Sequence, residues 1–243
     1  MSEPNEKEPA RPDASEKPKW TARSSPWTDL ALTVPVFLGY HLGVISLPVR
    51  NAADLVTTRL VVMANDNPVL YVMLTLVIGL ALTGVLALLG RGQAFELWRL
   101  GVVVLEGAAY AVAMGAMASY VVGSLRLSPA GGAGTGLVMA LGAGLYEEIA
   151  FRVVLFGLPV LLLRVLVGST VRRFVLTLAW AAVAAAVFSG WHYVGSMGDS
   201  FQLGSFVFRW VCGLAFTAIY ALRGFAPAVW THALYDIWVL VLV

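Results

Sequence analysis

The sequence predicts an all-α fold, a polytopic transmembrane helical bundle of seven or eight spans that follows a disordered N-terminal tail. Of the 243 residues, 59% are hydrophobic and 12% are charged, whereas about a quarter of a soluble domain is charged. Residues 1–26 alone hold ten of the thirty charged side chains. Seven apolar stretches are long enough to cross a bilayer. We therefore expect one membrane domain, residues 27–243, after the tail.

The tail, residues 1–26, is rich in Pro, Glu, Lys and Ser and shows no apolar periodicity. Such a segment cannot bury enough apolar surface to offset the entropy lost on ordering, so we expect it to be disordered. It lacks the basic start and the uninterrupted apolar stretch of a cleavable signal peptide. The first span is therefore expected to be retained as a membrane anchor and not cleaved off.

The spans follow from length, because a membrane-spanning helix needs about 20 mainly apolar residues. The stretches that qualify are about 27–48, 68–90, 100–125, 136–163, 174–194, 203–222 and 225–243. Between the first two, residues 49–67 could form a short amphipathic helix on the membrane surface or an eighth span.

The orientation follows from the excess of Lys and Arg in cytoplasmic loops. With the N-terminus in the cytoplasm, eleven Lys or Arg fall in cytoplasmic segments and three in outer segments. We therefore expect a cytoplasmic N-terminus and, with an odd number of spans, an outer Val243. Arg outnumbers Lys thirteen to three, which favours a bacterial cell membrane.

Several classes of function are not indicated. The basic residues are spread over the loops, so a nucleic-acid partner is not expected. A single cysteine, Cys212, excludes an intramolecular disulfide and a cysteine-based metal cluster. The glycines before the fourth span lack the strand-to-helix context and the Lys of a phosphate loop, so no nucleotide site is expected.

Ionisable side chains inside the spans are the main functional signal. Each costs about 2.5–3.5 kcal/mol on insertion scales, so such residues tend to be functional. They are His41, Glu106, Glu147, Glu148, Arg152, His192, Arg209, His232 and Asp236.

The densest group lies in the fourth span. Glu148 and Arg152 are four residues apart, so they share a helix face and can neutralise each other. Glu147 lies about 100° around the helix from Glu148 and has no such partner. A purely structural ion network would therefore explain Glu148 and Arg152 better than Glu147.

Two further groups each leave alternatives open. His192 is flanked by Trp191 and Tyr193, so it could be an interfacial residue as well as a catalyst. His232 and Asp236 are four residues apart on one helix face. The carboxylate could fix the imidazole tautomer for catalysis, or it could simply accept a hydrogen bond from the ring without a functional role.

Taken together, these groups form three motifs: EExxxR at 147–152, FxxxH at 188–192 and HxxxD at 232–236. In this order and spacing they resemble the CAAX protease and bacteriocin-processing enzyme family, also called Abi proteins, which are intramembrane glutamic endopeptidases. The resemblance covers about 136–240. It implies a polar pocket within the membrane, built from the fourth, fifth and last helices.

The resemblance also implies roles for individual residues. Glu147 matches the catalytic glutamate, and Glu148 and Arg152 match the supporting part of the first motif. His192, His232 and Asp236 match the remaining catalytic positions. Prenyl-protein proteases usually have Asn at the last position, and an ionised Asp cannot donate to an oxyanion. We therefore expect Asp236 to orient His232.

The expected chemistry is hydrolysis of a peptide bond in a membrane-associated protein or peptide, without cofactor or metal. Desolvation in the bundle makes the Glu147 carboxylate a stronger base for activating water. His192 would hold the same water, and His232 would donate to the oxyanion. Prenylated C-termini, bacteriocin leaders and C-terminal sorting tags are candidate substrates.

Three alternatives remain at this point. Glu147, His192 and His232 could form a zinc site. Ser189 with His232 is similar to the serine–histidine dyad of rhomboid proteases, although Val187 replaces the glycine of GxSG. The pocket could also serve binding, transport or a scaffold without catalysis.

Two geometric expectations complete the sequence interpretation. His41, Glu106 and Arg209 match no motif position, and we expect structural roles for them, with Glu106 and Arg209 pairing across helices or facing the cavity. Ideal straight spans place Glu147, His192 and His232 at different depths in the membrane. Convergence of the three therefore requires a tilted or broken helix.

Overall fold

The computed structural model describes residues 25–47, 49–65, 67–89, 97–122, 132–195 and 198–242. Apart from its last two residues, the expected disordered tail at 1–26 lies outside this part of the chain. The described residues are helical and contain no strand. The helices are α1 Pro26–Leu32, α2 Val34–Ser46, α3 Leu55–Met63, α4 Pro68–Leu89, α5 Trp98–Val122, α6 Gly132–Gly142, η2 Ala143–Gly157, α7 Leu158–Leu166, α8 Thr170–Trp191, α9 Leu203–Arg223, α10 Phe225–Ile237 and η3 Trp238–Leu242.

Within the described residues, six helical stretches are long and apolar enough to cross a membrane. They are Pro26–Ser46, Trp98–Met117, Gly132–Leu166, Thr170–Trp191, Leu203–Arg223 and Phe225–Leu242. Helix α4 adds 22 residues, about 33 Å at 1.5 Å per residue. All seven predicted stretches therefore form helices, and the protein is a multi-pass membrane protein. The nine-residue α3, about 14 Å long, is the short helix expected between the first two spans.

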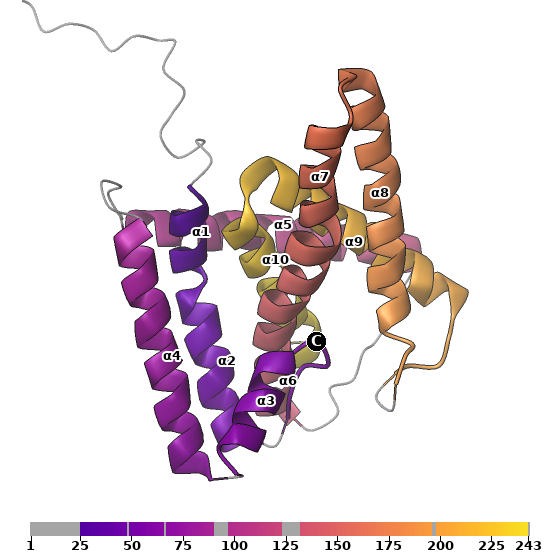
Figure 1. Cartoon of the computed structure of the whole chain (residues 1–243). Helices are drawn as coiled ribbons and strands as arrows, with labels where there is room; N and C mark the ends of the chain where they lie inside the picture. Colours follow the sequence, from indigo (N-terminus) through magenta and orange to yellow (C-terminus); the bar gives the residue numbers. More distant parts are fainter. Residues whose placement is uncertain are drawn as a thin grey trace, which may run out of the picture.

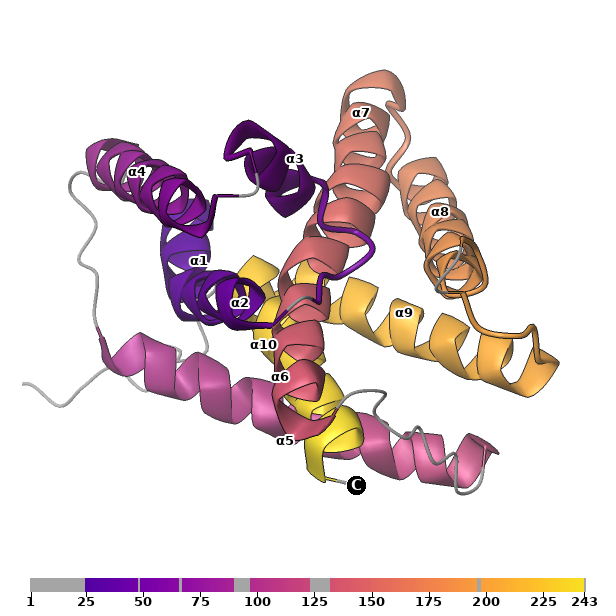
Figure 2. The same cartoon turned by 90° about the horizontal axis from the view of Figure 1, so that it is seen from below.

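Helix α10 occupies the centre of the molecule. It packs against α5, η2, α6 and α9, and Figure 1 shows α5 running crosswise to α2 and α4 behind it. Seen from below, α10 lies between α5 and the continuous α6–η2–α7 helix (Figure 2). Most of its residues are buried, including His232. The element that carries the third motif is thus the one that the other helices enclose.

The amino end of α10 is fixed by contacts from other helices. Gly224 has φ +117°, a conformation that favours glycine, and it separates α9 from α10. The Phe225 backbone N–H donates to Asp29 Oδ2 of α1 at 2.7 Å, so a carboxylate caps a helix terminus that carries partial positive charge. On the other side of this turn, Arg223 donates to both carboxylate oxygens of Glu106. The start of α10 is therefore tied to α1, and the end of α9 to α5.

Glycines let α10 approach its neighbours closely. A Cβ on Gly144 of η2 would lie 2.8 Å from the Ala233 nitrogen and 2.9 Å from the Val229 carbonyl oxygen. A Cβ on Gly107 of α5 would lie 3.1 Å from the Thr231 nitrogen. Small residues at helix contacts are a general means of bringing backbones together in membranes. At Gly144 the close approach carries the first motif towards the third.

The first motif lies in a π-helix instead of the α-helix that the sequence predicts. Residues Ala143–Gly157 form η2, in the middle of the 35-residue helical stretch Gly132–Leu166. A π-helix has i→i+5 hydrogen bonds and is frequent at functional sites. It is wider than an α-helix, so residues 147, 148 and 152 all contribute to one buried patch.

We predict that Gly144→Ala destabilises the protein by about 1–3 kcal/mol, because the added methyl group would overlap the α10 backbone. The matched control is Gly101→Ala in α5, where a Cβ would meet no atom within 4 Å. The control should be neutral or slightly stabilising, since Ala favours a helix over Gly by about 1 kcal/mol. Unfolding by SDS titration measures both variants, and equal stabilities would contradict the proposed close approach.

Candidate active site

Three helices bring the motif residues together. Glu147 and Glu148 come from η2, His192 from the carboxyl end of α8, and His232 from α10. Glu147 Oε2 lies 4.0 Å from His192 Nε2 and 4.0 Å from His232 Nε2. One carboxylate oxygen therefore faces both imidazoles.

Glu148 holds His232 in place. Its Oε1 lies 2.6 Å from His232 Nδ1, and because a carboxylate only accepts, Nδ1 carries the proton. The ring stacks on Phe216 with centroids 4.3 Å apart. Its Nε2 is left facing Glu147 and Asp236, whose Oδ2 lies 3.6 Å away. The orienting hydrogen bond expected from Asp236 is therefore made by Glu148, which reaches the other ring nitrogen.

Arg152 compensates the Glu148 charge. Its Nη1 lies 3.0 Å from Glu148 Oε1, and both side chains are fully buried, so the expected i,i+4 pair is present. The guanidinium carbon lies 4.2 Å from the ring centroid of Phe188 and 5.0 Å from that of Phe216. These cation–π contacts further compensate a charge removed from water.

Phe188 explains the spacing of the second motif. Its backbone carbonyl accepts from Nδ1 of His192, four residues later in the same helix, at 2.9 Å, which leaves Nε2 directed at Glu147. The Phe188 ring also packs edge-on against His192 and His232, with centroids 5.1 and 5.9 Å away. One aromatic residue thus contacts both histidines and Arg152.

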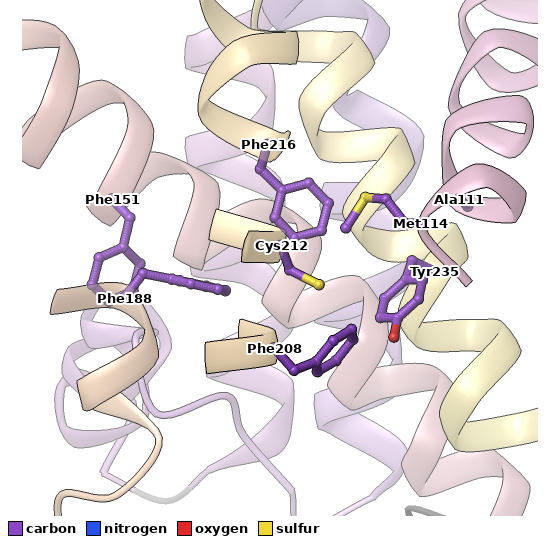
Figure 3. Close-up of a cluster of buried hydrophobic side chains, with 8 residues drawn as sticks. All are labelled: Ala111, Met114, Phe151, Phe188, Phe208, Cys212, Phe216 and Tyr235. Carbon is purple, nitrogen blue, oxygen red and sulfur yellow. The ribbon is translucent and has the colours of Figure 1, made fainter. Parts of the chain in front are cut away.

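An apolar cluster closes one side of these polar groups. It is built from side chains of α5, η2, α8, α9 and α10, and Figure 3 shows Phe188 and Phe216 in it beside Cys212 and Phe208. Cys212 is buried here, as a small core residue. Because the cluster adjoins the histidines, the ionisable groups lie in surroundings of low polarity, where electrostatic interactions are strong.

The α7–α8 hairpin explains why the first two motifs converge. The turn at 167–169 joins two antiparallel helices, which project together in Figure 1. His192 and Glu147 lie at similar distances along the chain from this turn, so the hairpin places them side by side. The two helices extend to Leu166 and from Thr170, past the ends of the spans predicted at 136–163 and 174–194.

Asn51 is a site residue that the sequence interpretation missed. Its Nδ2 donates to Glu147 Oε1 at 2.9 Å, and both residues are buried. It lies between α2 and α3, in the segment 49–67 that we had considered only as a surface helix or a span. A lone Asn in an inter-span segment has no sequence signal that marks it as part of a distant site.

The geometry does not suit two of the alternatives. Zinc ligands stand at about 2.0–2.1 Å from the ion in a tetrahedron, so they lie about 3.3 Å apart, closer than the 4.0 Å from Glu147 Oε2 to either Nε2. Over the described ranges, no group of three His, Cys, Asp or Glu side chains could hold a metal ion. Ser189 Oγ donates to the Phe206 carbonyl oxygen at 2.7 Å, away from a nucleophile's position.

The remaining intramembrane groups make structural contacts. Glu106 pairs with Arg223, and Arg209 pairs with Asp199, so the Glu106–Arg209 pair that we had considered does not form. His41 bonds through Nε2 to the Tyr146 hydroxyl at 2.8 Å.

One protein-family model matches the part of the chain that holds the three motifs. Residues 129–238 match the family model described as type II CAAX prenyl endopeptidase Rce1-like. This segment is similar to the CAAX protease family. The matched range includes all three motifs, and it excludes Asn51. No curated protein and no solved structure matches the chain. The segment that carries the three motifs is therefore similar to a family of endopeptidases.

We predict that Arg152→Leu destabilises the protein by about 3–5 kcal/mol, because it leaves the Glu148 carboxylate buried without its cation. The matched control is Arg164→Leu in α7, at an exposed position, which should change stability by less than about 0.5 kcal/mol. SDS titration of both purified variants tests this. An Arg152→Leu protein as stable as the wild type would show that the ion pair is dispensable.

Proposed function

We propose that this chain is an intramembrane endopeptidase that hydrolyses a peptide bond of a membrane-associated protein or peptide with water activated by Glu147. The observation that carries the proposal is the position of Glu147 Oε2. This buried oxygen accepts no hydrogen bond from the described residues, and it lies 4.0 Å from the Nε2 atoms of His192 and His232.

These distances suit a water molecule between Glu147 and His192. A water that makes hydrogen bonds of about 2.8 Å to two atoms 4.0 Å apart does so at an angle of about 90°. Neutral His192 has its proton on Nδ1, held by the Phe188 carbonyl, so its Nε2 accepts. Glu147 Oε2 and His192 Nε2 would then accept the two water protons, which leaves an oxygen lone pair free to attack a carbonyl carbon.

The proposed reaction has two steps. The water oxygen bonds to the carbonyl carbon while Glu147 takes its proton. The resulting oxyanion is stabilised by Nε2–H of a doubly protonated His232, whose charge Glu147, Glu148 and Asp236 compensate. Glu147 then returns the proton to the amide nitrogen, and the carbon–nitrogen bond breaks.

The cellular setting is part of the same proposal. The substrate is membrane-associated because the motifs lie on helices that are apolar enough to span a bilayer. From the eleven-to-three distribution of Lys and Arg, we propose a cytoplasmic N-terminus in a bacterial cell membrane.

The test compares proteoliposomes that contain the wild-type chain or Glu147→Gln, each incubated with a membrane-protein extract. Labelling of new amino termini, followed by mass spectrometry, reports every cleaved bond. Wild-type samples should contain new internal termini that the Glu147→Gln samples lack, because a glutamine cannot accept the water proton.

Two controls make this comparison decisive. Glu147→Gln should be expressed and folded like the wild type, and cleavage should persist with a zinc chelator. New termini in neither sample would refute the peptidase proposal. Equal cleavage by both proteins would refute the role of Glu147, and loss of cleavage with chelator would establish a metal mechanism instead.

We predict that Asp236→Asn retains cleavage within about tenfold of the wild type, because Glu148, and not Asp236, holds the imidazole of His232. An amide at this position can also donate to the oxyanion. His232→Ala should lose at least about 100-fold, the cost of removing an oxyanion donor. Initial rates on a peptide copied from an identified cleavage site measure both. Inactive Asp236→Asn would show that the second carboxylate is required.

A further inference from the structure

The two carboxylate oxygens of Glu147 have different surroundings. Oε1 accepts a hydrogen bond from Asn51 Nδ2 at 2.9 Å. Oε2 faces the two histidines. The hydrogen bond from Asn51 therefore holds one oxygen and leaves the other directed at His192 and His232.

The amide of Asn51 has only one orientation compatible with its neighbours. The Ala53 backbone N–H donates to Asn51 Oδ1 at 2.8 Å. A backbone N–H can only donate, so the end of the amide near Ala53 is the oxygen. The NH₂ end must then point at Glu147, where it can only donate to a carboxylate.

The backbone of Asn51 is itself held by a buried hydrogen-bond chain. Its N–H donates to the Tyr40 hydroxyl at 3.1 Å, and that hydroxyl donates to Asp54 Oδ2 at 2.6 Å. Asp54 Oδ1 also accepts from the Thr57 backbone N–H, so Asp54 caps the amino end of α3. The side chains of Tyr40 and Asp54 are buried. The position of Asn51 is thus fixed from both α2 and α3.

A second contact reaches the same turn of η2 from the N-terminal helices. The hydroxyl of Tyr146, next to Glu147, bonds to His41 of α2 at 2.8 Å, and His41 bonds to Tyr71 of α4 at 2.9 Å. The contact from Asn51 and the contact from His41 both come from residues 40–71, which precede the segment of the family match at 129–238.

We propose that Asn51 is a positioning residue that holds one carboxylate oxygen of Glu147 and thereby directs the other at the histidines. This inference rests on the proposed function of Glu147. A neutral amide suits the task, because it orients the carboxylate and favours its ionised form without pairing it with a full charge. An Arg or Lys in the same place would form an ion pair and weaken the base.

The experiment measures kcat, KM and the pH dependence of cleavage for the full chain in proteoliposomes. Its substrate is the peptide copied from the cleavage site identified above. Asn51→Ala should lower kcat by about 10-fold and Asn51→Asp by about 10- to 100-fold, the usual range for residues that orient a functional group. KM should stay unchanged, because Asn51 contacts the base and not the peptide.

The pH profile separates positioning from a structural role. Loss of the donor destabilises ionised Glu147, so the base is protonated at higher pH and the acid limb of the profile moves to higher pH. The other ionisable groups that face this region are His192 on α8, His232 and Asp236 on α10, Glu148 and Arg152 on η2, and Asp54 and Tyr40 behind Asn51. Asn51→Ala leaves all of these groups in place, so a shift in that variant reports on the lost donor. Asn51→Asp adds a carboxylate beside Glu147, and its repulsion moves the acid limb in the same direction.

Two further variants distinguish the possible failures. Tyr110→Phe removes a hydrogen bond to Glu106 in α5 and none of the contacts described for Glu147, so it should leave the acid limb in place. Asn51→Asp keeps the size of the side chain and the acceptor for Ala53, so it carries the test if Asn51→Ala folds poorly. Inactive Glu147→Gln with unchanged kcat and acid limb in both Asn51 variants would overturn this inference alone. Active Glu147→Gln would instead overturn the proposed function.

Discussion

The Glu148 carboxylate is the group on which the rest of the site depends. One oxygen of it lies within reach of both Arg152 and His232 Nδ1, so it joins η2 to α10 and compensates the charge of Arg152 in an apolar bundle. Breaking a buried ion pair costs more than forming it gains, because the remaining charge has no solvent. Glu147 makes no such pair, which is why we propose it as the base.

The site draws on more of the chain than its motifs suggest. The family match covers residues 129–238, yet Asn51 and His41 hold Glu147 and Tyr146 from outside it. Asp29 of α1 caps the helix that carries His232. The N-terminal helices therefore act as a brace for the matched segment. Substitutions there can alter the geometry of the site without touching a motif residue.

In the third motif, the spacing predicts only one of the two carboxylates that contact His232. His232 and Asp236 are four residues apart on one helix, which predicts a local pair. In the structure Asp236 approaches Nε2 at 3.6 Å, while Glu148 from another helix takes Nδ1 at 2.6 Å. The tertiary contact is the shorter because the missing Cβ of Gly144 lets η2 approach α10 closely. Asp236 is thereby left near the nitrogen that faces Glu147.

By itself the sequence determined the helical membrane class, the seven apolar stretches and the motif residues, because hydropathy, length and spacing are local properties. It also predicted the Glu148–Arg152 pair, which needs only helical spacing. The family resemblance implied that Glu147, His192 and His232 share a pocket, but only the tertiary structure decided the distances between them, the π-helical winding of η2 and the contact with Asn51. These features depend on helix register and close approach between segments far apart in the chain, and no local pattern encodes either.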